Sequence, residues 1–250
     1  MLNNLVSIIT PSFNSSQFII RAIESVLSQT YKEWELIIVD DGSEDNSVES
    51  IENFIKNKEQ IYLIKLNKNI GAANARNEAL KVAKGRYIAF LDSDDIWYPN
   101  KLELQIKFMR LNNYPVSFTS YEIIDQHSQL MHKEVHCEKK VSLRSYVKNT
   151  IIGFSSSMID RKLVQHDFKF SNLKVAEDLL FWIEIFENGY KAYGLDLILL
   201  KYRVHSKSLS ANKYKSAKQI LKIYLYKFGY IRAIYYFCFY TFNAIKKRVV

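Results

Sequence analysis

A short apolar run that ends in a group of carboxylates constrains this chain more than any other feature. Residues 87–91 (YIAFL) have the composition of a buried strand, and the next four residues are Asp92, Ser93, Asp94 and Asp95. Alternate side chains of a strand share a face, so Asp92 and Asp94 are expected to point together and Ser93 away from them. Three neighbouring carboxylates repel one another, which favours a bound Mg²⁺ or Mn²⁺. The alternative is a solvated turn that caps a helix beginning near Pro99.

Strand and helix patterns alternate through the first hundred residues. Apolar, β-branched runs predict strands, and apolar residues at helical spacing predict helices between them. The strands are expected at 6–10, 35–39, 61–66 and 87–91, and the helices at 18–28, 47–55 and 71–83. Such alternation predicts βαβ units and therefore an α/β fold built on a parallel sheet.

The second half of the chain is less regular. Helices are expected at 99–111 and 177–189 and from residue 214 onward. Strands are expected at 116–121, 155–159 and 193–202, and residues 120–140 are polar enough for a hairpin or a loop flap.

Polar groups follow three of the predicted strands where each strand ends. They are Pro11–Asn14, Asp40–Asp41 and Asp92–Asp95. Ligands of parallel α/β sheets bind at the carboxyl ends of the strands, so these three segments are expected to meet at one edge. The sequence contains neither G-x-G-x-x-G nor G-x-x-x-x-G-K-[ST], which argues against a dinucleotide site and a P-loop.

Charge is distributed unevenly along the chain. The formal net charge is +9, but residues 197–250 hold twelve Lys and Arg and no acid, which leaves −3 on residues 1–196. The basic character therefore belongs to the C-terminal part. Cys137 and Cys238 are far apart and lack metal-ligand spacing, and the N-terminus lacks the pattern of a signal peptide, so a cytoplasmic protein is expected.

Six segments together resemble the inverting family 2 glycosyltransferases of the GT-A fold. They are VSIITPSFN, QTYKEWELIIVDDGS, NIGAANARN, GRYIAFLDSDD, the AED before an apolar helix, and YRVHSKSLS. The resemblance covers roughly residues 5–210. It implies a GT-A domain over residues 1–212 with a Rossmann-like, mostly parallel central sheet flanked by helices, followed by a helical basic and aromatic extension over 213–250.

The resemblance also implies a nucleotide-diphospho-sugar donor, a divalent metal (Mn²⁺ or Mg²⁺), and roles for particular residues. Asp41, with Asp40 beside it, would contact the base in a pocket shaped by Pro11 and Phe13. Asp92 and Asp94 match the family's DxD, with Asp94 the more direct metal ligand. The other residues expected near the nucleotide sugar or the metal are Arg76, Ser93, Arg203 and His205.

The acid pair before the apolar helix is expected to supply the catalytic base. Inverting transfer needs a group that takes the proton of the acceptor hydroxyl as its oxygen attacks the anomeric carbon. Adjacent helical residues point about 100° apart, so only one of Glu177 and Asp178 can face the substrate. The resemblance implies Asp178. The alternative for the pair is a helix N-terminus that favours acids through its dipole.

Residues 213–250 lie outside the catalytic part of the family. They hold nine basic residues, no acids and eleven Tyr and Phe, and their densest apolar stretch, 234–242, is too short to span a bilayer. The interpretation preferred from this composition is peripheral association with the inner face of the cell membrane. The alternatives are a helix docked on the catalytic domain and nucleic-acid binding.

A membrane location in turn favours a lipid-linked acceptor. The expected activity is therefore transfer from a UDP-hexose to a polyprenyl-diphosphate saccharide in bacterial surface-polysaccharide synthesis. Two other classes remain open: a nucleotide-sugar-binding module without catalysis, and a sugar-1-phosphate nucleotidyltransferase. The sugar, the acceptor hydroxyl and the oligomeric state do not follow from the sequence.

Overall fold

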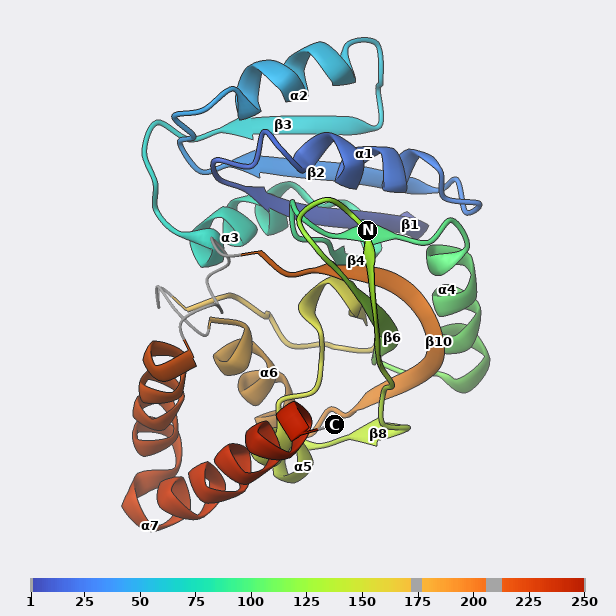
Figure 1. Ribbon diagram of the computed structural model, residues 1–250. Coiled ribbons are helices and arrows are strands. Elements are labelled where there is room, and N and C mark those ends of the chain that lie inside the picture. Colours follow the sequence, from blue (N-terminus) through green and yellow to red (C-terminus); the bar gives the residue numbers. More distant parts are fainter. Residues whose placement is uncertain (1, 172–176, 206–212, 250) are drawn as a thin grey trace.

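The computed structural model describes residues 2–171, 177–205 and 213–249, without the side chains of 213–215 and 245–249. The elements follow one another as β1 (Leu2–Ser12), α1 (Ile19–Leu27), β2 (Trp34–Asp40), α2 (Ser47–Ile55), β3 (Ile61–Lys65), α3 (Ala72–Val82), β4 (Gly85–Phe90), β5 (Ile96–Trp97), α4 (Lys101–Asn112), β6 (Val116–Ile124), β7 (Leu130–Val135), β8 (Lys140–Val141), α5 (Leu143–Asn149), a 3₁₀ turn (Phe154–Ser156), β9 (Met158–Asp160), α6 (Glu177–Glu187), β10 (Ala192–Arg203) and α7 (Lys213–Val249). Figure 1 shows them arranged around one sheet.

The sheet is parallel in its first half and mixed in its second. Its strand order is β3-β2-β1-β4-β9-β6-β10-β5, with β7 paired to β6 and β8 to β10. The pairs among β3, β2, β1 and β4 are all parallel, and β10 also runs parallel to β6. The short strand β9 lies antiparallel between β4 and β6. The predicted α/β fold, with helices on both faces of the sheet, is confirmed.

Alternation along the strands divides the core into two apolar layers. On one face Ile8, Leu36 and Ile38 pack against α1, α2 and α4. On the other face Ile9, Ile37 and Phe90 pack against α3, α5, α6 and part of α7. Strands buried on both sides read as continuous apolar runs, which is why the sequence signal was strong there.

The ends of β1, β2 and β4 lie at one edge, as expected. Ser12 is the register partner of Asp40, and the Asp41 amide donates to the Ser12 carbonyl at 2.8 Å. The Leu91 amide donates to the Ile9 carbonyl, which places the segment after β4 beside β1. The carboxyl ends of the strands therefore form one platform for the polar residues that follow them.

Several local expectations differ from the structure. Strand β4 ends at Phe90, so Asp92 and Asp94 belong to a turn and strand alternation does not set their directions. Of the strand expected at 155–159, the first part belongs to the 3₁₀ turn Phe154–Ser156, where the hydroxyls of Ser156 and Ser157 donate to the carbonyls of Gly153 and Phe154. Helix α5, with seven residues and a capping box of Ser142 and Ser145, was too short for its periodicity to be seen. Residues 120–140 do form a hairpin, of β6 and β7.

Helix α7 packs on the catalytic part of the chain through one side. Ile220, Ile223, Tyr224 and Ala233 are buried in the same apolar layer as α5 and α6, and the Tyr224 hydroxyl donates to the Val147 carbonyl at 2.6 Å. Gly229, with a φ of 71°, interrupts the helix, and Figure 1 shows α7 turning there into two segments. Within the described ranges, no helix is long and apolar enough to cross a membrane. The docking alternative thus holds for one side of α7.

Candidate active site

The acidic turn after β4 holds three carboxylates that turn to three different partners. Asp92 accepts a hydrogen bond from Arg76 of α3 at 2.7 Å. Asp94 contacts the His205 ring at 3.0 Å, and Asp95 accepts the backbone amide of Arg203 at 2.9 Å. The turn is anchored from below because the Asp92 amide donates to the Ser155 hydroxyl. Segments far apart in sequence therefore converge on these four residues.

The pair formed by Asp94 and His205 lies at the surface of the turn. Their side chains are 27% and 13% exposed, so the Asp94 carboxylate is reachable from solvent while the ring is mostly covered. Burial, and then the charge of Asp92, raises the pKa of Asp94, although the hydrogen bond to His205 opposes that shift. The His205 ring packs against Phe18, with 5.1 Å between ring centroids. This arrangement supplies one carboxylate and one imidazole to whatever binds above the turn.

Arg203 holds the acidic turn from behind. Its guanidinium donates to the backbone carbonyls of Asp94 and Asp125 and to the Ser128 hydroxyl, and it lies 4.8 Å from the centroid of the Phe18 ring. The residue is 1% exposed. The turn above it includes Asp95, which accepts the Arg203 amide; burial, and then the charge of Asp94, raises the pKa of Asp95 well above its ordinary value. The structure thus places Arg203 beneath the turn, buried and with protein acceptors for three of its donors.

Arg76 links the acidic turn to the start of α6. Its two terminal nitrogens donate to Asp92 at 2.7 Å and to Glu177 at 3.1 Å. The guanidinium is also held over the Phe154 ring at 4.6 Å and the Phe170 ring at 5.5 Å. Burial would lower the pKa of Arg76, but the Asp92 and Glu177 carboxylates outweigh it and raise the value. Arg76 is therefore a fixed cation between two acids.

Asp178 differs from its neighbour Glu177 in having no cationic partner among the described residues. Its carboxylate accepts only the amide of Leu179, at 2.8 Å, in the hydrogen bonds of the described chain. Burial, and then the negative charge of Glu177, raises the pKa of Asp178 to about 6. A carboxyl group with that pKa is ionised at neutral pH and still basic enough to accept a proton, which suits a general base.

Asp40 and Asp41 brace the loops at the ends of β1 and β2. Asp40 accepts hydrogen bonds from the hydroxyls of Ser12 and Ser43 and from the Ser43 amide. Both oxygens of Asp41 are taken by backbone amides, those of Ile70 at 2.7 Å and Gly71 at 2.8 Å. Both acids are buried, at 1% and 2% exposure. Asp40 thus ties the end of β1 to the loop after β2, and Asp41 fixes the loop that leads into α3, the helix of Arg76.

The remaining predicted residues lie around this edge. Pro11 is the next-to-last residue of β1 and pairs in register with Val39. Phe13 follows directly and is 45% exposed, so its ring is open to a ligand. Ser93 is half-buried in the acidic turn. Of the resemblance segments, Ala176 and Ser206–Ser210 lie outside the described residues, as does Asn212, where the proposed domain boundary falls.

The predicted metal ligands Asp92, Asp94 and His205 do not form one cluster. Asp94 and His205 are together, but Asp92 turns to Arg76. Across residues 2–171, 177–205 and 213–249, no group of three or more His, Cys, Asp and Glu is arranged to hold a metal ion. The pair alone fits a hard cation whose other ligands come from elsewhere, because Mg²⁺-like ions commonly bind one or two carboxylates plus substrate phosphates. Burial is the main cause of the raised pKa of Asp94 and the nearby charge of Asp92 adds to it, and a cation would offset both.

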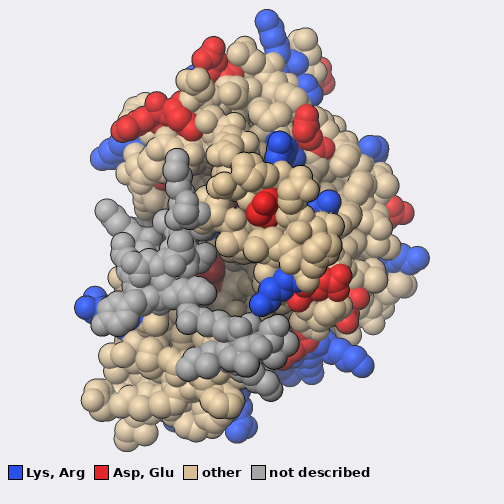
Figure 2. Space-filling view, viewed as in Figure 1, with Lys and Arg blue, Asp and Glu red and all other residues tan. Residues whose placement is uncertain are grey.

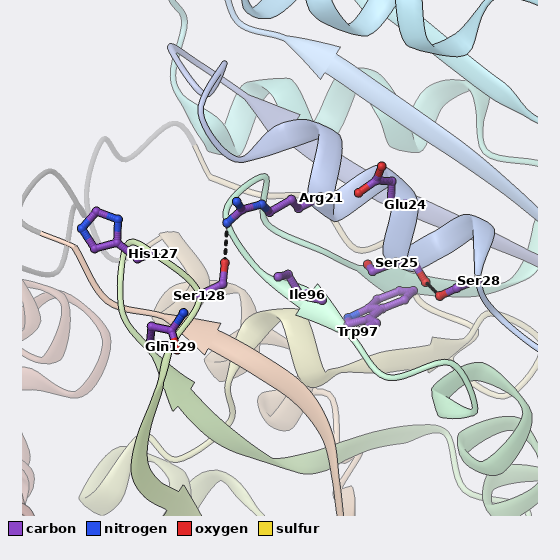
Figure 3. A pocket seen from close by; sticks show the side chains of 9 residues that line it. All are labelled: Arg21, Glu24, Ser25, Ser28, Ile96, Trp97, His127, Ser128 and Gln129. Carbon is purple, nitrogen blue, oxygen red and sulfur yellow. Dashed lines mark hydrogen bonds between the residues drawn. The ribbon is translucent and has the colours of Figure 1, made fainter.

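A cavity of about 460 Å³ lies on the other side of the turn, between α1 and the β6–β7 hairpin. Figure 3 shows Arg21 and Ser128 on opposite walls, joined by a hydrogen bond of 2.6 Å, with Trp97 at the base. Ser128 also accepts from Arg203, so this cavity shares a wall with the acidic turn. None of the predicted site residues lines it among those described. Figure 2, which has the orientation of Figure 1, shows a recess near the centre of the molecule with acidic atoms on its wall.

Sequence reasoning missed the residues that support the predicted ones. Ser155, Phe154 and Phe170 position Asp92 and Arg76, yet each comes from an irregular segment with no motif. The ion pair between Arg76 and Glu177 spans 101 residues of sequence and leaves no local signal. The apolar pattern of residues 177–189 and the AED segment pointed to that helix, but neither pointed to Arg76 as the partner of Glu177.

Comparison with known families and proteins agrees with this geometry. The profile described as Glycosyl transferase family 2 matches residues 7–168. The putative teichuronic acid biosynthesis glycosyltransferase TuaG of Bacillus subtilis is 39% identical over 247 residues, 98% of each chain. WfgD of Escherichia coli, a UDP-Glc:α-D-GlcNAc-diphosphoundecaprenol β-1,3-glucosyltransferase, is 42% identical over 86% of this chain and 83% of its own.

Solved structures share the fold at lower identity. Residues 1–349 of Staphylococcus aureus TarS, in complex with UDP-GlcNAc, superpose with a TM-score of 0.70 at 23% identity, over 88% of this chain and 66% of that one. The mannosyltransferase PcManGT of Pyrobaculum calidifontis, in complex with GDP-Man and Mn²⁺, gives 0.69 at 17% identity, over 90% of this chain and 64% of its own. At these identities the likeness concerns the fold alone.

Proposed function

This chain belongs to glycosyl transferase family 2 and is a glycosyltransferase, and we propose that it transfers a hexose from UDP with inversion. The acceptor is a hydroxyl group of a lipid-linked saccharide. The observation that carries the proposal is the position of Asp178, an unpaired carboxylate next to a Glu177 that Arg76 ties to the acidic turn. Base and donor side are thereby parts of one connected site.

The base acts on the acceptor. As the acceptor oxygen forms its bond to the anomeric carbon, Asp178 takes the hydroxyl proton, and the bond between that carbon and the diphosphate oxygen breaks to release UDP. Attack from the face opposite the leaving group inverts the configuration. A positioned base contributes roughly 10²–10⁴-fold to such a step. Its pKa of about 6 supports the role, because the ionised form prevails at neutral pH.

A divalent cation, Mn²⁺ or Mg²⁺, would be held by Asp94 and His205, with Asp92 nearby. When bound, it would offset the negative charge that develops on the departing diphosphate. Arg203 then has a positioning role. Its guanidinium donates to the Asp94 carbonyl and its backbone amide donates to the Asp95 carboxylate, and both hydrogen bonds hold the turn in place.

The donor nucleotide is proposed to lie at the ends of β1 and β2. Phe13 offers an exposed ring, Pro11 shapes the strand end, and Asp40 and Asp41 hold the surrounding loops. Ser93 and Arg76 complete the proposed nucleotide-sugar side. A UDP donor is supported by WfgD, which is named for UDP-Glc, and by the TarS complex with UDP-GlcNAc.

The acceptor is proposed to be a polyprenyl-diphosphate saccharide of a bacterial surface polysaccharide. WfgD and WfaP are both named for a GlcNAc-diphosphoundecaprenol acceptor, and TuaG for teichuronic acid biosynthesis. Such an acceptor requires the enzyme to work at the inner face of the cell membrane as a peripheral protein. In this proposal residues 1–212 carry the catalysis and residues 213–250 contribute membrane contact.

One assay tests the function. The full chain is incubated with labelled UDP-glucose or UDP-GlcNAc, Mn²⁺ and GlcNAc-diphosphate-lipid, and both the nucleotide released and the anomeric configuration of the product are measured. UDP release with an inverted linkage is expected. A parallel reaction with UTP and glucose 1-phosphate that yields UDP-glucose and pyrophosphate would indicate a nucleotidyltransferase, and donor binding without turnover would indicate a binding module; either result would overturn the proposal.

A further inference from the structure

The second segment of α7 exposes an apolar stripe to solvent. Its members are defined by large exposed side chains at helical spacing: Ile231, Ile234, Tyr235, Phe239 and Phe242. Residues three, four, seven and eight apart share one side of a helix, so these five side chains form one continuous surface, called here the outer stripe. Ile231 is 84% and Phe242 67% exposed.

The opposite side of the same helix is also apolar. Ala233 is fully buried, and Tyr236, Phe237 and Tyr240 pack against the core layer that α5 and α6 share. A helix at the surface of a soluble domain normally turns a polar side to water. This segment does not, and contiguous exposed apolar surface marks a contact with a partner or a membrane.

Positive charge surrounds the outer stripe. Lys148 of α5 donates to the Tyr235 hydroxyl at 3.1 Å and lies 4.3 Å from the centroid of the Phe239 ring. Arg144 of α5 is exposed and close enough to Tyr235 to contribute to lowering its pKa, after the hydrogen bond from Lys148. Arg232 is exposed beside Ile231. Neither α5 nor α7 contains an acidic residue. Figure 2 shows few charged side chains where α7 occupies the lower left of the view.

We propose that the outer stripe, with Arg144, Lys148 and Arg232, is the surface by which the protein lies on an anionic lipid bilayer. The inference rests on the proposed function, which places the enzyme at a membrane. It assigns the membrane contact to α5 and the second segment of α7 together, not to the whole C-terminal tail. Aromatic rings at a basic surface suit the zone between headgroups and acyl chains. Basic residues near an anionic leaflet add attraction that salt screens.

A second copy of the chain fits this surface less well. In a twofold symmetric dimer the same patch meets itself. Arg144, Lys148 and Arg232 would then face their own counterparts with no acid on either helix to pair with them. Anionic headgroups supply the missing negative charge, which is why a bilayer is the occupant proposed.

The test is cosedimentation of the full chain with vesicles of phosphatidylcholine, alone or with 30–40% phosphatidylglycerol, a range chosen to be strongly anionic. Binding is expected only with the anionic lipid and is expected to weaken with salt. The double variant Ile231→Glu/Phe242→Glu should bind at least about tenfold more weakly, and Lys148→Gln about fivefold. Leu111→Glu, at an equally exposed apolar residue of α4 (75%), is the matched control and should bind like the parent.

Thermal unfolding and transfer to a soluble acceptor analogue are measured on the same variants. The melting temperature and the rate of transfer should both be unchanged, because the outer stripe is exposed and lies outside the proposed active site. Unchanged vesicle binding of the double variant would overturn the inference. The inference would also be overturned if the parent protein did not bind vesicles and formed a dimer that the double substitution dissociated. Vesicle binding needs no turnover, so failure of the proposed transfer reaction would show in the soluble assay and not here.

Discussion

Glu177 lies 3.1 Å from a terminal nitrogen of Arg76, which neutralises the acid that directly precedes Asp178. The same guanidinium binds Asp92 at 2.7 Å. One cation therefore pairs with an acid of the turn after β4 and with an acid at the start of α6. Asp178 is the acid of the pair that has no cationic partner among the described residues.

This relationship separates the two acids experimentally. Asp178→Asn keeps size and polarity but cannot accept a proton, so kcat should fall by roughly 10²–10⁴ while binding of UDP-sugar persists. Glu177→Gln should lower kcat less. It should also move the acidic limb of the pH–rate profile to lower pH, because a negative charge that raises the pKa of Asp178 is gone. Steady-state kinetics from pH 5 to 9 provide the measurement; a larger loss in Glu177→Gln than in Asp178→Asn would reverse the assignment.

The raised pKa of Asp178 also predicts a cost in stability. The folded state holds the Asp178 proton up to a pKa of about 6, whereas an unfolded chain releases it near the ordinary value of 3.8. The stabilising contribution of the protonated form is thus full at low pH and is lost as pH rises from about 4 through about 6. At pH 8 Asp178→Asn should be more stable than the parent by on the order of 1–2 kcal/mol, after allowance for partial exposure. Urea unfolding at pH 5 and pH 8 checks this, and an equal gain at both values would contradict it.

Removal of Arg76 should destabilise the fold. Arg76→Met leaves Asp92 and Glu177 without their shared cation, and breaking a buried pair in this way costs about 3–5 kcal/mol. Lys81→Met on the same helix is the control, since its pair with Glu78 is largely exposed and should matter by less than about 1 kcal/mol. Chemical denaturation of both variants is the measurement. Equal changes in the free energy of unfolding would mean that the ion pairs of Arg76 do not contribute measurably to stability.

Metal dependence is expected to act through Asp94. Treatment with EDTA should abolish transfer and Mn²⁺ or Mg²⁺ should restore it, with Asp94→Ala nearly inactive and Asp92→Ala strongly impaired. Ser93→Ala, in the same turn, removes no proposed metal ligand and should impair transfer less than either aspartate variant. Full activity of Asp94→Ala in the absence of metal would exclude the proposed role. Calorimetric titration of Mn²⁺ in the presence of UDP gives a readout that does not need turnover.

Deletion of residues 213–250 should yield an unfolded or aggregated protein. Ile220, Ile223 and Tyr224 are at most 8% exposed and close the layer over α5, and each such side chain is worth about 1.5–3 kcal/mol when buried. Circular dichroism and size-exclusion chromatography of the truncated chain test this. A soluble, folded truncation would show that α7 is dispensable for the core.

The parts of the fold that the sequence predicted are those with short-range causes. Strands β1, β2 and β4 are apolar on both faces, and Asp40, Asp41 and Asp92–Asp95 sit where each strand ends, so their common edge follows from parallel topology alone. Other contacts of the site join residues more than 100 positions apart, such as Arg76 with Glu177 and Arg203 with Asp94. No periodicity encodes such contacts. For α7, composition alone gave a basic aromatic tail, and only packing shows that one side of it belongs to the core.

Gly229 is the residue at which α7 changes direction. Its φ of 71° is the backbone state that glycine enters freely, and no atom would crowd an added Cβ there, so an alanine would meet only the backbone penalty of roughly 1–2 kcal/mol. Both segments pack on the core, and the second also carries the outer stripe. Gly229 therefore sets the angle between two segments that both lie against the layer of α5 and α6. In the proposed membrane contact, that one backbone angle also fixes the slope at which the outer stripe meets the lipid surface.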